Sequence, residues 1–325
     1  MRISSGFAIA TVVATGVAAM ALPGPAQADR NFPARPVRLV VPFSPGGTPD
    51  TLARMIGPKM SENWAQPVVV ENRVGAGGTI GAALVAKATP DGHTLLLTSP
   101  ALAIGAAIKS NLPYDTIKDF AGVTNIGFST QVLVVAPTLG VKSVKELIAL
   151  AQAQPGKILF GSAGAGSTTH MNGERFRFTA GIKATHVGFK GQPEFLIEIM
   201  AGRIHYGIGG LTVILPLITD GRLLALAVAE RTPLLPEVPA YAEVLPGWGR
   251  DGSQMVLAPA GTPRPVLEKI SKEVARVLDL PDVRNRLQAV SFHIAPSTPG
   301  ETDRMLRADI STFSKVARQA GLIAR

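Results

Sequence analysis

Two segments of this chain combine glycines with small hydroxyl residues between an apolar run and the start of a helix. The first is Ser44-Pro45-Gly46-Gly47-Thr48-Pro49-Asp50, which follows residues 39–43, and the second is residues 161–169, which follow residues 158–160. Such a turn exposes backbone N–H groups at the positive end of a helix dipole, where anions bind. Because the two turns lie more than a hundred residues apart, we expect two lobes that each present one turn to a shared cleft.

The first 28 residues predict export. Arg2 supplies a positive charge, residues 7–22 are apolar and uncharged, and Ala26-Gln27-Ala28 has the small-x-small pattern of a cleavage site. The apolar stretch has 16 residues, fewer than the roughly 20 of a membrane-spanning helix. We therefore predict a signal peptide cleaved after Ala28. The chain has no cysteine, which excludes disulfides, thiolate metal sites and a lipid-modified cysteine.

Strand and helix patterns alternate along the rest of the chain, which favours an α/β fold with largely parallel sheets. We expect one lobe from residues 29–128 and 253–325 and a second from residues 129–252. The apolar strands at residues 131–136 and 253–259 are the expected crossings between the lobes. A double crossing of this kind would form a hinge that lets the lobes close on a ligand.

The chain lacks the sequence motifs that several other functions require. The glycine turn at residues 75–81 reads G-A-G-G-T-I-G rather than the dinucleotide-binding G-x-G-x-x-G, and no phosphate-binding loop is present. Neither Ser162 nor Ser167 lies in a G-x-S-x-G motif. The five histidines show no metal-binding spacing, so we predict neither a metal nor a cofactor. A hydrolase stays open as an alternative, with His170 or His186 as the base near one of these serines.

The charge balance favours anionic partners without indicating nucleic acid. The net charge is +9 and becomes +8 when the signal peptide, which carries Arg2, is removed. Basic residues are scattered, and aromatic residues make up 5% of the chain, so no nucleic-acid-binding motif is indicated.

A series of motifs in order resembles the substrate-binding proteins of tripartite tricarboxylate transporters, the Bug-type periplasmic receptors. These motifs are residues 32–50, 70–78, 90–92, 161–170, 187–191, 235–239 and 258–263. The resemblance covers essentially the whole mature chain. It implies a type II periplasmic binding fold, a monomer, and a protein that is not an enzyme. It also implies capture of a small organic acid for delivery to a membrane transporter or, alternatively, to a membrane signalling partner.

The resemblance and the two turns point to the same ligand-binding residues. In such receptors the turns hold a carboxylate, partly through ordered waters, and short hydroxyl side chains leave room for these waters. Lys190 could add charge and Phe189 an apolar wall, whereas we expect Asp50 to cap the first helix. The predicted site consists of Phe43, Ser44, Gly46, Gly47, Thr48 and Ser99 on one lobe and Ser162, Ala163, Gly164, Gly166, Ser167, Thr168, Phe189, Lys190 and Gly210 on the other.

Two departures from the family pattern concern the far end of the expected pocket. The chain has Gly209-Gly210-Leu211-Thr212 where an acidic or amide residue is common, and Ser253-Gln254-Met255 where an aromatic residue is common. Both departures remove a polar or aromatic side chain from the expected lining of the pocket. We therefore expect an aromatic or medium-chain carboxylate ligand rather than an amino acid.

Overall fold

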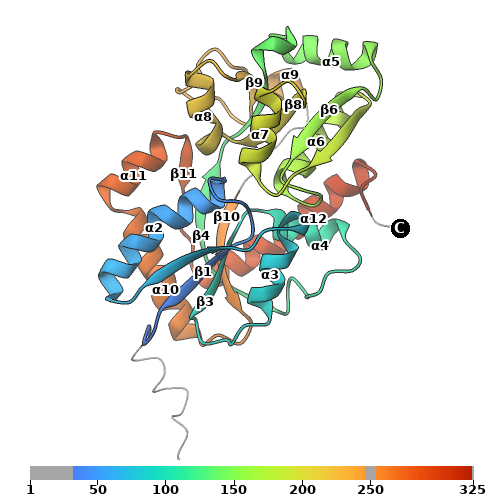
Figure 1. Ribbon diagram of the computed structural model, residues 1–325. Helices are drawn as coiled ribbons and strands as arrows, with labels where there is room; N and C mark the ends of the chain where they lie inside the picture. The colour runs from blue at the N-terminus through green and yellow to red at the C-terminus, as the bar shows by residue number, and fades with distance from the viewer. Residues whose placement is uncertain (1–31, 246–252, 324–325) are drawn as a thin grey trace, which may run out of the picture.

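Short runs rich in valine and leucine form the strands of two separate sheets. The computed structural model describes residues 32–245 and 253–323, and the two sheets lie in two lobes (Figure 1). The first sheet has the order β11-β4-β10-β3-β1-β2, with β1 at Val37–Val41, β2 at Val68–Asn72, β3 at Thr94–Thr98, β4 at Phe120–Ser129, β10 at Ser253–Pro259 and β11 at Phe292–Ile294. The second has the order β7-β6-β8-β5-β9, with β5 at Gln131–Val135, β6 at Ile158–Ser162, β7 at Ala184–Gly188, β8 at Tyr206–Gly210 and β9 at Leu224–Val228.

Both sheets are mixed rather than largely parallel. β1 is parallel to β2 and β3, but β10 is antiparallel to β3 and β4. Similarly, β6 is parallel to β7 and β8, but β5 is antiparallel to β8 and β9. The reason is that β5 and β10 begin at the cleft between the lobes, where β1 and β6 end.

Helices cover both faces of each sheet, as the alternation of side chains along the strands requires. Leu39 and Val41 pack with α2 and α10, whereas Val40 packs with α3, α4 and α12. In the second lobe, Leu133 and Val135 face α5 and α6, whereas Val132 and Val134 face α7 and α8. The helices are α2 (Thr48–Trp64), α3 (Thr79–Ala86), α4 (Ala101–Ile108), α5 (Val144–Ala153), α6 (Thr168–Thr179), α7 (Gln192–Met200), α8 (Leu211–Thr219), α9 (Tyr241–Val244), α10 (Arg264–Leu278), α11 (Pro281–Gln288) and α12 (Pro299–Gln319), with short 3₁₀ helices η1 (Ala76–Gly78) and η2 (Pro137–Leu139).

The chain passes from the first sheet to the second at Thr130, between β4 and β5. The strand at residues 131–135 lies wholly in the second sheet and the strand at residues 253–259 wholly in the first, so neither strand is itself a crossing. Leu245 packs in the core of the second lobe and Ser253 begins β10 of the first sheet, while residues 246–252 between them lie outside the described residues. The predicted signal peptide also lies outside them. Within the described ranges, no helix is both long enough and apolar enough to span a membrane.

Two isoleucines of α7 test the packing of the second lobe. Ile199 is fully buried in the apolar cluster between α7 and the sheet, whereas Ile197 on the same helix is 54% exposed. We expect Ile199→Ala to lower the free energy of unfolding by about 2–5 kcal/mol, because it leaves a cavity in the core. Ile197→Ala should change it by less than about 0.5 kcal/mol. Urea unfolding of both variants measures the difference, and equal losses would contradict this assignment of the core.

Candidate functional site

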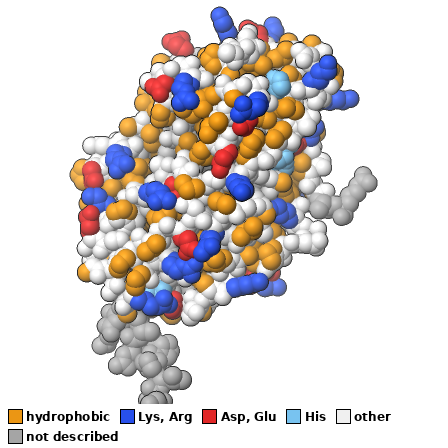
Figure 2. All heavy atoms as spheres, in the orientation of Figure 1, with side chains coloured by type: hydrophobic (Ala, Val, Ile, Leu, Met, Phe, Trp, Pro, Cys, Tyr) orange, Lys and Arg blue, Asp and Glu red, His pale blue; other side chains and the backbone are white. Residues whose placement is uncertain are grey.

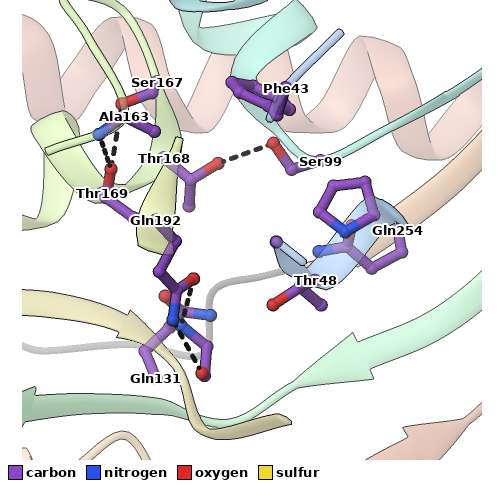
Figure 3. A pocket seen from close by; sticks show the side chains of 13 residues that line it. Phe43, Thr48, Ser99, Gln131, Ala163, Ser167, Thr168, Thr169, Gln192 and Gln254 are labelled. Atoms are coloured by element: carbon purple, nitrogen blue, oxygen red, sulfur yellow. Dashed lines mark hydrogen bonds between the residues drawn. The ribbon is translucent and has the colours of Figure 1, made fainter. Parts of the chain in front are cut away.

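Four helices of the two lobes begin at or next to residues that line one small cavity. Figure 3 shows the side chains that line it. Thr48 begins α2, Thr168 begins α6, Gln192 begins α7, and Gly210 immediately precedes α8. The cavity offers about 40 Å³ to the centres of water-sized spheres. Its lining residues are Phe43, Gly47, Thr48, Pro49, Ser99, Gln131, Ala163, Ser167, Thr168, Thr169, Gln192, Gly210 and Gln254.

Among the described residues, those that line the cavity include no charged side chain. The positive potential in it comes from the helix N-termini, whose first N–H groups have no partner within their own helix. No side chain caps α2, α7 or α8. Thr48 is 5% exposed, and its Oγ1 has no hydrogen-bond partner. A buried hydroxyl without a partner is costly, so the site is suited to a ligand that supplies one.

Asp50 fixes the first turn from inside α2. Its carboxylate accepts hydrogen bonds from the N–H of Gly46 at 2.8 Å and from the side chains of Arg54 and Asn72. The N-cap of α2 is Gly47, so Asp50 braces the turn before the helix rather than capping the helix. Burial alone would raise the pKa of Asp50, but these hydrogen bonds outweigh burial and hold the pKa below its usual value.

Hydroxyl groups fix the second turn by bonding to its own backbone. The N–H of Ala163 donates to Thr169 Oγ1 at 2.8 Å, and the N–H of His170 donates to Ser167 Oγ at 3.2 Å. Ser167 thus caps α6. Across the cleft, Thr168 Oγ1 donates to Ser99 Oγ at 3.2 Å, so one bond between the lobes lies at the cavity.

Ser162 and His186 form the pair that a hydrolase would need. Ser162 Oγ and His186 Nε2 are joined by a hydrogen bond of 2.6 Å, and the His186 ring lies 4.2 Å from the ring of His170, measured between centroids. However, Ser162 is completely buried and does not line the cavity, and its Oγ also accepts the N–H of Gly164 at 3.1 Å. The pair therefore stabilises the second turn and is out of reach of a bound molecule.

The structure brings part of the predicted site together. The predicted residues that line the cavity are Phe43, Gly47, Thr48, Ser99, Ala163, Ser167, Thr168 and Gly210. The others, which do not line it, are Ser44, Gly46, Ser162, Gly164, Gly166, Phe189 and Lys190.

The residues outside the cavity lie there for physical reasons. Ser44 packs against Gly191, and the glycines at positions 46, 164 and 166 face the opposite lobe. Phe189 packs on the apolar cluster of α7 and α8, and Lys190 is exposed. A direct charge from Lys190 on the ligand therefore stays a prediction, since this side chain lies outside the cavity.

Sequence reasoning did not place Gln131, Gln192, Pro49 or Thr169 in the site, and it noted Gln254 only as a departure from the family pattern. Gln192 bonds to both backbone groups of Gly210, at 3.0 and 3.3 Å, while Gln131 accepts a hydrogen bond from Asn172. Gln131 and Gln254 stand at the cleft ends of β5 and β10. The sequence feature that could have indicated Gln131 and Gln254 as lining residues is a glutamine at the start of an apolar strand, because a buried glutamine side chain needs polar partners.

Acidification should lower the free energy of unfolding through the two histidines behind the second turn. Burial lowers the pKa of His170 and that of His186 to about 4, from 6.5 in an unfolded chain. The unfolded chain therefore binds more protons between about pH 6.5 and 4. The stability that the neutral rings contribute is complete above about pH 6.5 and is lost as the pH falls through 4.

Urea unfolding between pH 7 and 4 should show a smaller loss for His186→Gln than for the wild type. Asp309, whose pKa burial raises to about 6, acts in the opposite sense in both proteins and cancels in the difference. The same pH dependence in His186→Gln and the wild type would contradict the assignment.

Comparison with known proteins agrees with this geometry. The model of the tripartite tricarboxylate transporter family receptor matches residues 52–322. A protein from the tcbD-tcbE intergenic region of Pseudomonas sp. is 36% identical over 295 residues, which cover 90% of this chain and 88% of that protein. BugT of Bordetella pertussis is 32% identical over 315 residues, covering 95% and 96% of the two chains.

Solved structures give the same result. An R. palustris protein with adipate is 34% identical, with a TM-score of 0.86 over 89% of this chain and 98% of that chain. MatC from Rhodopseudomonas palustris with bound malate is 31% identical, with a TM-score of 0.83 over 88% and 99%. The chain therefore belongs to the tripartite tricarboxylate transporter receptor family, whose members are periplasmic binding proteins rather than enzymes.

Proposed function

We propose that this protein captures a small organic carboxylate in the cavity between its lobes and delivers it to a membrane transporter. The observation that carries the proposal is an uncharged cavity ringed by the N-termini of α2, α6, α7 and α8. Helix N-termini attract anions, and neutral donors orient them without the strong, unselective attraction of a lysine or arginine. The adipate and malate bound by two relatives are carboxylates, which supports the same ligand class here.

The surface supports a site defined by local geometry rather than by a basic patch. On the face shown in Figure 2, Lys and Arg are spread over both lobes and interspersed with Asp and Glu. The excess of positive charge therefore acts as a weak long-range attraction.

Of the two ligand types expected from the sequence, an aromatic and a medium-chain carboxylate, the cavity favours the aliphatic one. Among the described residues that line it, Phe43 is the one aromatic residue. The space that Gly210 leaves is not free, because a Cβ at this position would lie 2.5 Å from Thr48 Oγ1.

A thermal-shift screen of the mature protein tests the ligand class. We expect mono- and dicarboxylates such as adipate and malate to raise the unfolding temperature in a concentration-dependent way, because a ligand that binds the folded state stabilises it. A stabilising effect of about 2.7 kcal/mol is expected at a hundred times the dissociation constant. Stabilisation by sugars or phosphate but by no carboxylate would contradict the proposal. Uptake of the stabilising acid by cells with and without this protein tests delivery.

Thr48 provides a sharper test of the site. We expect Thr48→Val to weaken carboxylate binding by about five- to thirtyfold, since it removes a hydroxyl worth about 1–2 kcal/mol to a bound partner. Thr116→Val is the matched control, because Thr116 Oγ1 is also buried and without a partner but lies outside the cavity. Calorimetric titration of both variants with adipate and malate measures the effect. Equal affinity of Thr48→Val and Thr116→Val would show that Thr48 does not contact the ligand.

A further inference from the structure

A third glycine turn, at residues 75–78 of the first lobe, lies directly against the second ligand-binding turn. A Cβ atom placed on Gly77 would lie 2.2 Å from the carbonyl oxygen of Ala165 and 3.2 Å from the nitrogen of Ser167. One placed on Gly164 would lie 3.3 Å from the nitrogen of Gly77. The backbones of the two turns are thus in direct contact across the lobes, and they lie too close together for a side chain to fit between them.

Lys109 fixes this third turn and extends the contact. Its Nζ donates hydrogen bonds to the carbonyl oxygen of Ala76 at 2.7 Å and to Thr79 Oγ1 at 2.8 Å. The end of its side chain lies against Gly166 of the other lobe, where a Cβ would be 2.7 Å from Lys109 Cε. The lysine therefore packs between the turn that it holds and the turn of the opposite lobe.

The first ligand-binding turn meets the opposite lobe in the same way. A Cβ placed on Gly191, the residue before α7, would lie 2.7 Å from Ser44 Cβ and 3.0 Å from Ser44 Oγ. On the same side, a Cβ placed on Gly46 would lie 3.5 Å from Pro193 Cγ. Each ligand-binding turn thus rests on a glycine of the other lobe, and neither Gly77 nor Gly191 lines the cavity.

We propose that Gly77 and Gly191 are the contact points, here called seats, against which the ligand-binding turn of the opposite lobe packs when the lobes are closed. They thereby control ligand affinity through lobe closure without touching the ligand. The inference rests on the proposed function, because closure matters to affinity where the ligand lies between the lobes. The apparent dissociation constant equals the intrinsic one divided by the fraction of molecules able to close. A side chain at either seat reduces that fraction.

Gly77→Ala and Gly181→Ala form a matched pair. Both glycines have a left-handed backbone, with φ of +64° and +62°, so alanine carries a similar backbone cost at each. A Cβ on Gly181 meets nothing within 4 Å. We expect Gly77→Ala to weaken adipate or malate binding at least tenfold in calorimetric titration, while Gly181→Ala stays within twofold of the wild type. Equal weakening in both variants would overturn the proposal.

Gly191→Ala separates the contact from backbone strain, because Gly191 has an extended backbone with φ of −165° that any residue adopts. We expect at least a fivefold weakening of binding with an unfolding temperature close to that of the wild type. Wild-type affinity in Gly191→Ala would overturn this seat.

Small-angle X-ray scattering without ligand tests the contact between the lobes separately from ligand binding. We expect a larger radius of gyration for Gly77→Ala than for the wild type and Gly181→Ala, because the added side chain holds the lobes apart. If no carboxylate binds the wild type but this difference is found, the proposed function fails and the seats stand. The same radius in all three proteins would overturn the seats whatever the ligand.

Discussion

The structure depends on the direction of its helices, which place several N-termini at one point. The strands β1, β6, β7 and β8 each end at the cleft and lead into one of the helices α2, α6, α7 and α8, so the positive helix ends of both lobes face the same cavity. Each such end contributes about 0.3–1 kcal/mol to the binding of an anion. Several weak contributions attract a carboxylate and still allow release, whereas a buried lysine would need a permanent counter-charge. A receptor that must deliver its ligand benefits from this balance.

The local parts of the site could be predicted from the sequence. An apolar run, a glycine turn and a helix start are all encoded within about ten residues, and this is why the sequence could point to Thr48, Ala163 and Thr168, which line the cavity. The α/β class follows from the alternation of strand and helix patterns, and the two lobes were expected from the separation of the two turns. The N-cap of α12 is equally local, because Thr298 accepts the N–H of Glu301 three residues later.

The parts that depend on tertiary structure could not be predicted. Gln131 and Gln254 reach the cavity because β5 and β10 begin at the cleft, and no local pattern shows where a chain passes between sheets. For the same reason the antiparallel pairs were not foreseen. β4 shows no clear strand pattern in the sequence, because its buried Thr124 and Asn125 interrupt the apolar run. Asn125 donates to the carbonyl of Ala295, 170 residues away. Ser162 was assigned to the ligand although its hydroxyl is used by His186.

Glycine has two separate roles in the cleft, and the sequence does not distinguish them. The missing side chain of Gly47 leaves room inside the cavity, and that of Gly210 leaves room for Thr48. At Gly77 and Gly191 it instead allows one lobe to pack against the other. The first role acts on the intrinsic affinity and the second on the fraction of closed molecules. Because the two factors multiply, substitutions that never touch a ligand can change its apparent affinity. Relatives with the same lining residues could therefore differ in affinity through their seat positions alone.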